Sequence, residues 1–223
     1  MFIAAAVFIA LGVYVAATQT LRVNIGNGQQ MPVFLKQRTA NVIAAVCIVI
    51  GVLFAAGGAF AQSADAIQKR LESEATKLQT WTSDKTIVNA VVAQNAQHLT
   101  MAEIERRDKE WIAGHADALV KQSLTGPCAD RVRQLASSSP AYGESFVMDD
   151  QGAIVCANVK TSDYWQGDEA KWQKSFNGGK GATFIDRPRM DDSAKEHLAQ
   201  VSLPIRDASG KVIGALTVGI KLN

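Results

Sequence analysis

The sequence has few of the side chains that carry catalytic or metal chemistry. It contains three His and three Cys in 223 residues, and neither type is spaced as a set of metal ligands. It has no Gly-x-Ser-x-Gly, no His-Glu-x-x-His and no phosphate-binding glycine loop. The net charge is only +2, without a stripe of basic and aromatic residues. These absences argue against an enzyme, a metal or cofactor site and nucleic-acid binding.

Acidic residues are missing from the first 61 residues, which carry two apolar runs, at 2–17 and 40–61. Lys36 and Arg38 precede the second run, and its end has the order Ala59-x-Ala61. A basic start, an apolar run and an Ala-x-Ala site are typical of a signal peptide.

We therefore expect residues 31–61 to be a signal peptide beginning at Met31. Residues 1–30 are then an over-long start, and the mature chain begins near Gln62. The alternative is a pair of membrane helices, in residues 1–30 and 31–61, whose basic loop the positive-inside rule places in the cytoplasm. In both cases residues 62–223 lie outside the cytoplasmic membrane, in the periplasm or an equivalent compartment, free or anchored in the inner membrane.

Helical patterns fill residues 62–140. Apolar residues recur at steps of three and four over 63–81, which predicts a long amphipathic helix. Asp84 and Thr100 are expected N-caps of two further helices, the second in a Thr-x-x-Glu capping box. Pro127 is suited to the first position of another helix.

Over residues 141–223 the apolar period changes from 3.6 to 2, the period of a strand. Turn sequences at 149–152 and 207–210 predict two hairpins. Five strands are expected, at residues 145–148, 153–159, 182–187, 197–206 and 211–222. Helices followed by hairpin-linked strands indicate an α+β fold, in which the long helix and several short ones pack on a five-stranded antiparallel sheet.

Residues 161–172 join the second and third of these strands with an unusual composition for a connector. They hold Tyr164, Trp165 and Trp172 beside acids and a lysine, whereas turns favour small polar residues. We expect a helix with Trp165 and Trp172 on one face, because they are seven residues apart. The two rings either cap the core or line a concave ligand surface.

In the ligand-binding interpretation, the aromatic rings contact a carbon skeleton, Asp168 holds an amine and Lys171 holds a carboxylate. Tyr164 and Lys171 are expected at the rim of this cavity. The alternative for Asp168 and Lys171 is an ordinary surface ion pair.

A second cluster of charges follows the third strand. Arg187 and Arg189 are alternate residues, so they point to the same side of an extended chain and suit an anion. Asp191 lies beside them, and the alternative is a solvated edge in which acids balance the arginines. We expect the cavity between the sheet, residues 161–172 and this loop.

Two cysteines, Cys128 and Cys156, lie in the exported part, where disulfides persist. Cys47 lies in the second apolar run. Cys128 and Cys156 are a candidate disulfide, and two separately buried thiols are the alternative.

Four segments resemble the PDC/Cache group of extracytoplasmic sensor domains, in particular its small single-module members. They are FVMDDQGAIV at 146–155, TSDYWQGDEAKW at 161–172, QVSLPIRD at 200–207 and GKVIGALTVG at 210–219. The resemblance extends from about residue 63 to the end. It implies a PAS-like strand order 2-1-5-4-3 and a long N-terminal helix on the sheet. Asp191 matches the family's Asp-x-Ser, whereas Arg187 and Arg189 have no obvious counterpart.

Together, the residues and the resemblance predict a non-catalytic extracytoplasmic module that senses an amino acid or a small carboxylate. Most members of the group report to a kinase or a chemoreceptor, so we expect a membrane receptor or transmitter protein as partner. A homodimer through the long helix is a further expectation. The alternative function is a protein-interaction module that docks a membrane receptor through the same aromatic surface.

Overall fold

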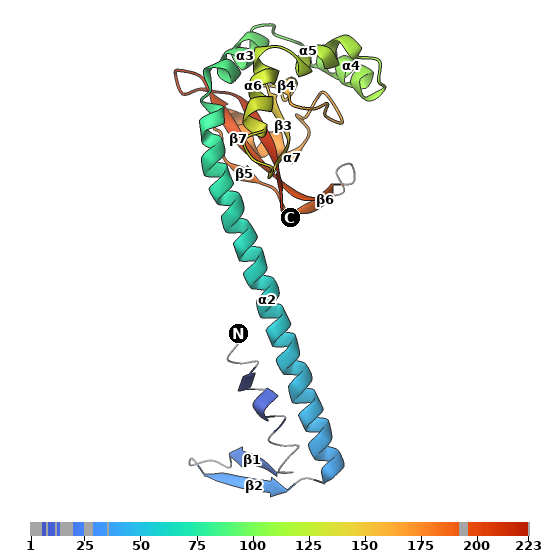
Figure 1. Ribbon diagram of the computed structural model, residues 1–223, viewed down its shortest axis with the longest axis vertical. Coiled ribbons are helices and arrows are strands. Elements are labelled where there is room, and N and C mark those ends of the chain that lie inside the picture. Colours follow the sequence, from blue (N-terminus) through green and yellow to red (C-terminus); the bar gives the residue numbers. More distant parts are fainter. Residues whose placement is uncertain are drawn as a thin grey trace. The chain divides into compact units, whose positions relative to one another are not determined.

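The computed structural model describes residues 6–7, 9–11, 13, 20–24, 29–34, 36–191 and 196–222 (Figure 1). For residues 24, 51, 53–63, 190, 191 and 196 it describes the backbone alone. The chain divides into two compact units, Met1–Ile67 and Gln68–Asn223. One helix, α2 (Gln37–Thr82), has residues in both.

The first unit contains an antiparallel hairpin of β1 (Thr20–Asn24) and β2 (Gln30–Phe34). This hairpin was not predicted; β1 precedes the expected signal peptide, and β2 overlaps its first residues. No helix built from described residues is both long and apolar enough to cross a membrane. The signal peptide stays a prediction.

In the second unit three helices begin where the sequence predicts. Asp84 accepts a hydrogen bond from the backbone N–H of Thr86 at 2.9 Å, and Thr100 accepts one from Glu103 at 3.3 Å. The helix after Ala116 was not predicted, because Ala116 has no side-chain cap to mark the start. The bounds are α3 (Lys85–Asn95), α4 (Met101–Ile112), α5 (Asp117–Leu124) and α6 (Pro127–Ala136).

The main sheet contains the five expected strands in antiparallel order β4-β3-β8-β7-β5. Counted along the chain this is 2-1-5-4-3, as the resemblance implies. A sixth short strand, β6, was not predicted and pairs with β7. The bounds are β3 (Tyr142–Met148), β4 (Ile154–Ala157), β5 (Phe184–Ile185), β6 (Arg189–Asp191), β7 (Glu196–Arg206) and β8 (Val212–Lys221).

Strand β5 is much shorter than the predicted 182–187. The register pairs Phe184 with Ser202, which puts Ala182 opposite Pro204. Proline has no N–H to donate to a ladder, and the N–H of Ala182 donates to the carbonyl of Ser175 instead, at 2.9 Å. The strand therefore cannot continue toward its N-terminal side.

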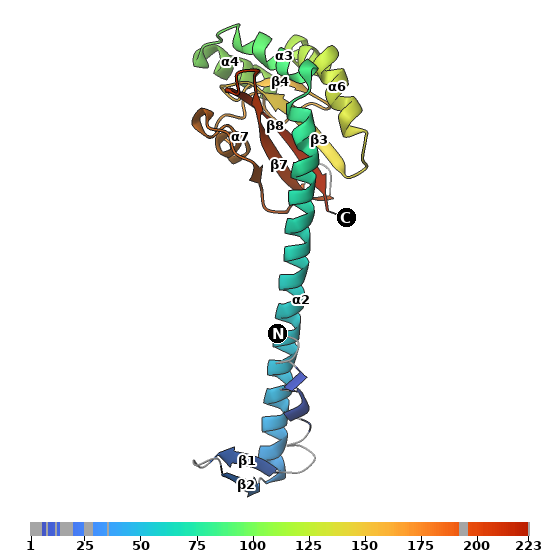
Figure 2. The same cartoon turned by 90° about the vertical axis from the view of Figure 1, so that its left-hand side faces the viewer.

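The register assigns side chains to the two faces of the sheet, since residues directly opposite each other share a face. The row Phe146, Thr217 and Ser202 lies on one face, which we call the α7 face because α7 (Ala170–Phe176) contacts β7 and β8 there. The other face carries Cys156 and is covered by α3 and α6. Figure 2 shows α7 and α6 on opposite sides of β7 and β8.

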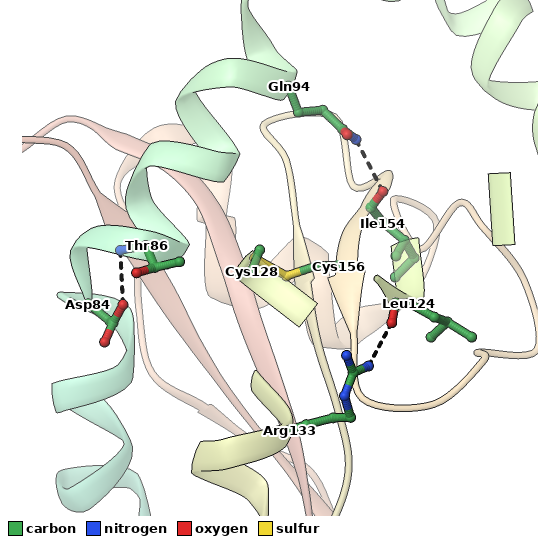
Figure 3. Close-up of a disulfide and its surroundings, with 8 residues drawn as sticks. All are labelled: Asp84, Thr86, Gln94, Leu124, Cys128, Arg133, Ile154 and Cys156. Atoms are coloured by element: carbon green, nitrogen blue, oxygen red, sulfur yellow. Dashed lines mark hydrogen bonds between the residues drawn. A yellow bond between two sulfur atoms is a disulfide. The ribbon is translucent and has the colours of Figure 1, made fainter. Parts of the chain in front are cut away.

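A disulfide joins Cys128 of α6 to Cys156 of β4, with the Cα atoms 6.0 Å apart (Figure 3). This is the pairing that the sequence offers as a candidate. Gln94 of α3 reaches the same strand, where its amide donates to the carbonyl of Ile154 at 3.2 Å. The helical layer is thus tied to the edge strand β4 by one covalent bond and one hydrogen bond.

Gly214 lies where β8 meets α3. A Cβ there would lie 2.2 Å from the carbonyl oxygen of Met148 and 3.0 Å from Val91 of α3. A glycine in the strand therefore leaves room for the close approach of α3.

Candidate ligand-binding site

Residues 161–172 do not form the predicted helix. Trp165 lies in a β-bridge with Ala153, and α7 begins only at Ala170. Trp165 and Trp172 therefore belong to different elements, and the expectation of one helical face was wrong.

Two glycines explain why the segment follows the β3–β4 turn. Gly152 has a φ of +87°, and a Cβ there would lie 2.5 Å from the Cα of Gly167. A Cβ on Gly167 would lie 2.4 Å from the indole nitrogen of Trp165. Only residues without side chains allow the two backbones to approach this closely.

Both indoles bind the β3–β4 turn. The Nε1 of Trp165 donates to the carbonyl of Gln151 at 2.9 Å, and that of Trp172 donates to the carbonyl of Asp149 at 3.1 Å. Trp172 also stacks on Phe176, with ring centres 4.9 Å apart. The two Trp side chains are partly buried against the hydrophobic core, and they fix the segment to the turn.

Tyr164 is buried in the core, not at a rim. Its ring centre lies 5.8 Å from that of Trp111 in α4. Asp108 of α4 accepts the backbone N–H groups of Tyr164 and Trp165, both at 2.9 Å. Burial raises the pKa of Tyr164, the charge of Asp149 adds to this, and hydrogen bonding to Arg107 opposes it.

Asp149 is a buried carboxylate at the start of the same turn. It accepts hydrogen bonds from the N–H groups of Gln151 and Ala153, both at 2.9 Å, and from the amide of Gln94 at 3.1 Å. Burial raises the pKa of Asp149, and these hydrogen bonds offset the increase only in part.

Lys171 belongs to the first turn of α7 and is only 8% exposed. Its Nζ is 3.1 Å from a carboxylate oxygen of Glu169 and 5.3 Å from the centre of the Phe146 ring. Its ion-pair partner is thus Glu169, whereas Asp168 is exposed. A lysine with so little exposed surface is unusual and needs a partner.

Two hydroxyls share the sheet row of Phe146, the ring that the ammonium of Lys171 approaches. Ser202 and Thr217, on β7 and β8, are fully buried, and their hydroxyl oxygens are 2.8 Å apart. One hydroxyl donates to the other, so the second retains a proton for another acceptor. The α7 face therefore has a cation and a hydroxyl donor close to the Phe146 ring.

The arginine cluster is solvent-exposed. Arg187 and Arg189 are exposed; the guanidinium of Arg189 pairs with Asp186 and approaches the side chain of Gln200 at 3.3 Å. The side chain of Asp191 lies outside the described part. Three hollows lie beside the end of α2, beside α4 and beside α6. None of the three is lined by a predicted ligand-binding residue.

Sequence reasoning missed Glu169, Phe146, Ser202 and Thr217. A signal was present for Thr217, a polar residue within the largely apolar strand β8; β7 carries other polar residues, so Ser202 did not stand out. Their pairing could not be seen without the register of β7 and β8.

Gln166 carries a buried oxygen that has no partner. The side chain is 1% exposed, and its Oε1 is the only buried side-chain nitrogen or oxygen among the described residues without a hydrogen bond. Its amide nitrogen is already used by the carbonyl and carboxylate of Asp163. The free oxygen can accept from a water or a ligand N–H.

No protein-family model matches the chain, and neither does any curated protein. Solved structures match it at low identity. The sensor domain of the histidine kinase DctB from V. cholerae is 13% identical, with a TM-score of 0.45 and coverage of 77% of this chain and 57% of that chain.

Two chemoreceptor domains match similarly. The ligand-binding domain of the amino acid chemoreceptor PctC from Pseudomonas aeruginosa, solved with GABA, is 16% identical over 71% of this chain and 61% of that chain, with a TM-score of 0.36. The domain of Tlp3 from Campylobacter jejuni, solved with 4-methylisoleucine, is 15% identical over 68% and 60%, with a TM-score of 0.34.

This chain thus spans 57–61% of the length of these solved domains. They are sensor domains of histidine kinases and chemoreceptors, the kind of domain that the sequence resembles. Since the identities are below 25% and the TM-scores below 0.5, the function has to be argued from the residues of this chain.

Proposed function

We propose that the chain is an extracytoplasmic sensor module that binds an amino acid or a small carboxylate at the α7 face, without catalysis. The observation that carries this proposal is the buried ammonium of Lys171. Holding a cation out of water costs free energy, and Glu169 is its one carboxylate partner among the described ion pairs. We attribute the retention of this buried cation, despite its cost, to ligand binding.

The groups around Lys171 are complementary to a zwitterion. A ligand carboxylate accepts from Lys171 and from the free hydroxyl proton of the Ser202–Thr217 pair. The ligand's amine then donates to Glu169, whose side chain is 37% exposed. In this account the Lys171–Glu169 pair occupies the two charged subsites until a ligand separates it.

The remaining predicted residues are proposed as outer contacts. Trp172 and Trp165 supply apolar walls, Asp168 adds a negative charge at the entrance, and Arg187 and Arg189 attract an anion from the neighbouring edge. Asp191 completes the proposed set, whereas Tyr164, buried in the core, is left out of it.

We propose the periplasm or an equivalent compartment as the location, since the Ala59-x-Ala61 order and the Cys128–Cys156 disulfide both suit an exported protein. The proposed partner is a membrane receptor or transmitter protein that reads the ligand state. Homodimer formation through α2 is part of the same proposal.

A thermal-shift screen tests the function. The twenty amino acids and a set of small carboxylates are each added to the protein, and a ligand that binds only the folded state raises the Tm. We expect at least one amino acid to raise it in a saturable way and to slow hydrogen exchange of residues 170–176. A screen in which no compound raises the Tm contradicts the proposal and favours the protein-interaction module.

A further inference from the structure

A hollow of about 510 Å³ lies beside the C-terminal end of α2. It is lined by residues from the C-terminal turn of α2 and by Leu203 and Pro204 of β7. Leu203 points to the opposite side of the sheet from its neighbour Ser202. No lining residue of the hollow belongs to the site proposed above.

One arginine is fixed at the edge of this hollow. The guanidinium of Arg206 donates to the carbonyls of Gly210 and Lys180, both at 2.9 Å, which holds its plane between two loops. Gly181 keeps the second loop close, because a Cβ there would lie 2.7 Å from the guanidinium. Two of the five N–H donors are used in this way, and the others remain for a ligand.

The charge of Arg206 is not balanced by an ion pair. None of the ion pairs formed by described residues includes it. Its neighbour Asp207 directs one carboxylate oxygen into its own turn, where it accepts from the N–H and hydroxyl of Ser209 and from the N–H of Lys211, at 2.6–3.1 Å. Arg206 is the one cation of this lining and Asp207 its one carboxylate, so an anion is favoured at the free N–H groups of Arg206.

The facing wall supplies hydrogen-bond acceptors. The hydroxyl of Thr82 donates to the carbonyl of Gln79 at 3.0 Å, and that of Ser83 donates to the carbonyl of Thr80 at 3.2 Å. Their oxygens retain lone pairs that can accept from a ligand hydroxyl. Pro204 adds an apolar surface to the same lining.

We infer that this hollow is a second small-molecule site, which binds a small hydroxycarboxylate. The carboxylate accepts two N–H groups of Arg206, the arrangement that a planar guanidinium favours. The hydroxyl donates to Thr82 or Ser83, and the short carbon skeleton lies on Pro204.

L-lactate is the probe, and a titration followed by two-dimensional amide NMR is the measurement. We expect saturable shifts at the amides of Thr183, Ala208 and Gly210. Glycerol, which has hydroxyls but no carboxylate, should leave them unchanged. Arg206→Gln should weaken lactate binding at least tenfold.

Because Arg206 also fixes two loops, Ala208→Phe provides a second variant that fills the hollow and leaves Arg206 in place. It should weaken binding similarly, whereas Arg106→Gln, which changes an exposed arginine on α4, should not change it. Parent-like affinity in both Arg206→Gln and Ala208→Phe overturns the inference. So does the absence of saturable shifts in the parent, or binding that is lost in Lys171→Met and kept in Arg206→Gln.

Discussion

The ammonium of Lys171 lies 5.3 Å from the centre of the Phe146 ring, so a charge from α7 rests on an inner strand of the sheet. One turn further along, Lys174 places its ammonium 4.6 Å from the ring of Phe184. The second lysine is exposed and the first is buried. A contact between an ammonium and an aromatic ring is ordinary at the surface but costs free energy in the interior. For this reason we place the ligand at Lys171.

Gly152→Ala should destabilise the fold strongly. The new Cβ would lie 2.5 Å from the Cα of Gly167 and on a φ of +87°, so both strain and a backbone clash result. We expect a loss of about 3 kcal/mol or more in the free energy of unfolding. Gly178→Ala is the control: it has a φ of +58° and open space, and should lose about 1 kcal/mol. Equal losses in urea unfolding would show that the turn contact is unimportant.

Removing the disulfide should destabilise the second unit, Gln68–Asn223. Cys128 and Cys156 are 28 residues apart, and closing a loop of this length stabilises by about 3–4 kcal/mol in the chain-entropy model. Replacing both by Ser should lower the free energy of urea unfolding by this amount. Maleimide labelling of denatured, unreduced protein should leave both cysteines unmodified. Their modification, located by mass spectrometry, would disprove the bridge.

Asp149 should make stability depend on pH with a definite sign. Burial raises its pKa above 3.8, so the folded state binds the proton more tightly than the unfolded state. This contribution is fully present below the unfolded pKa and is lost as the pH rises through the folded pKa. Asp149→Asn cannot titrate, so the parent should gain stability relative to this variant as the pH falls from 7 toward 4. Urea unfolding at several pH values checks this; a constant or reversed difference contradicts it.

The mature protein should begin near Gln62. The basis is the order of Lys36 and Arg38, an apolar run and Ala59-x-Ala61. N-terminal sequencing of protein purified from the cell envelope measures the cleavage site directly. Recovery of a chain that retains residues 31–61 in the membrane fraction would support the anchored alternative.

The features predicted well from the sequence are those decided locally. Asp84 and Thr100 cap helices through bonds to residues two and three positions ahead, and the turns after β3 and β7 have characteristic sequences. The strand order agreed because the family resemblance supplied it. Periodicity alone gives no order, since pairing depends on contacts between distant residues.

The features missed were decided by contacts across the sequence. Trp165 and Trp172 have helical spacing, but the approach of Gly152 to Gly167 places Trp165 against the hairpin instead. Ser202 and Thr217 are 15 residues apart and meet only through the β7–β8 register. Asp168 and Lys171 looked like a pair by spacing, yet α7 starts after Asp168 and Lys171 turns toward Glu169.

We propose that the buried ammonium of Lys171 binds the ligand. In Lys171→Met the stem is kept and the charge is lost, and Glu169 is exposed enough to be solvated without its partner. The unliganded variant should therefore be as stable as the parent or more stable by about 1 kcal/mol. The matched control is Lys174→Met, which changes an exposed lysine on the same helix.

The most direct measurement is isothermal titration calorimetry of parent, Lys171→Met and Lys174→Met with the amino acid that raises the parent's Tm most in the screen. We predict that Lys171→Met binds it at least tenfold more weakly while remaining folded, and that Lys174→Met binds it as the parent does. Parent-like affinity in Lys171→Met would contradict the account and remove the α7 face as the ligand site.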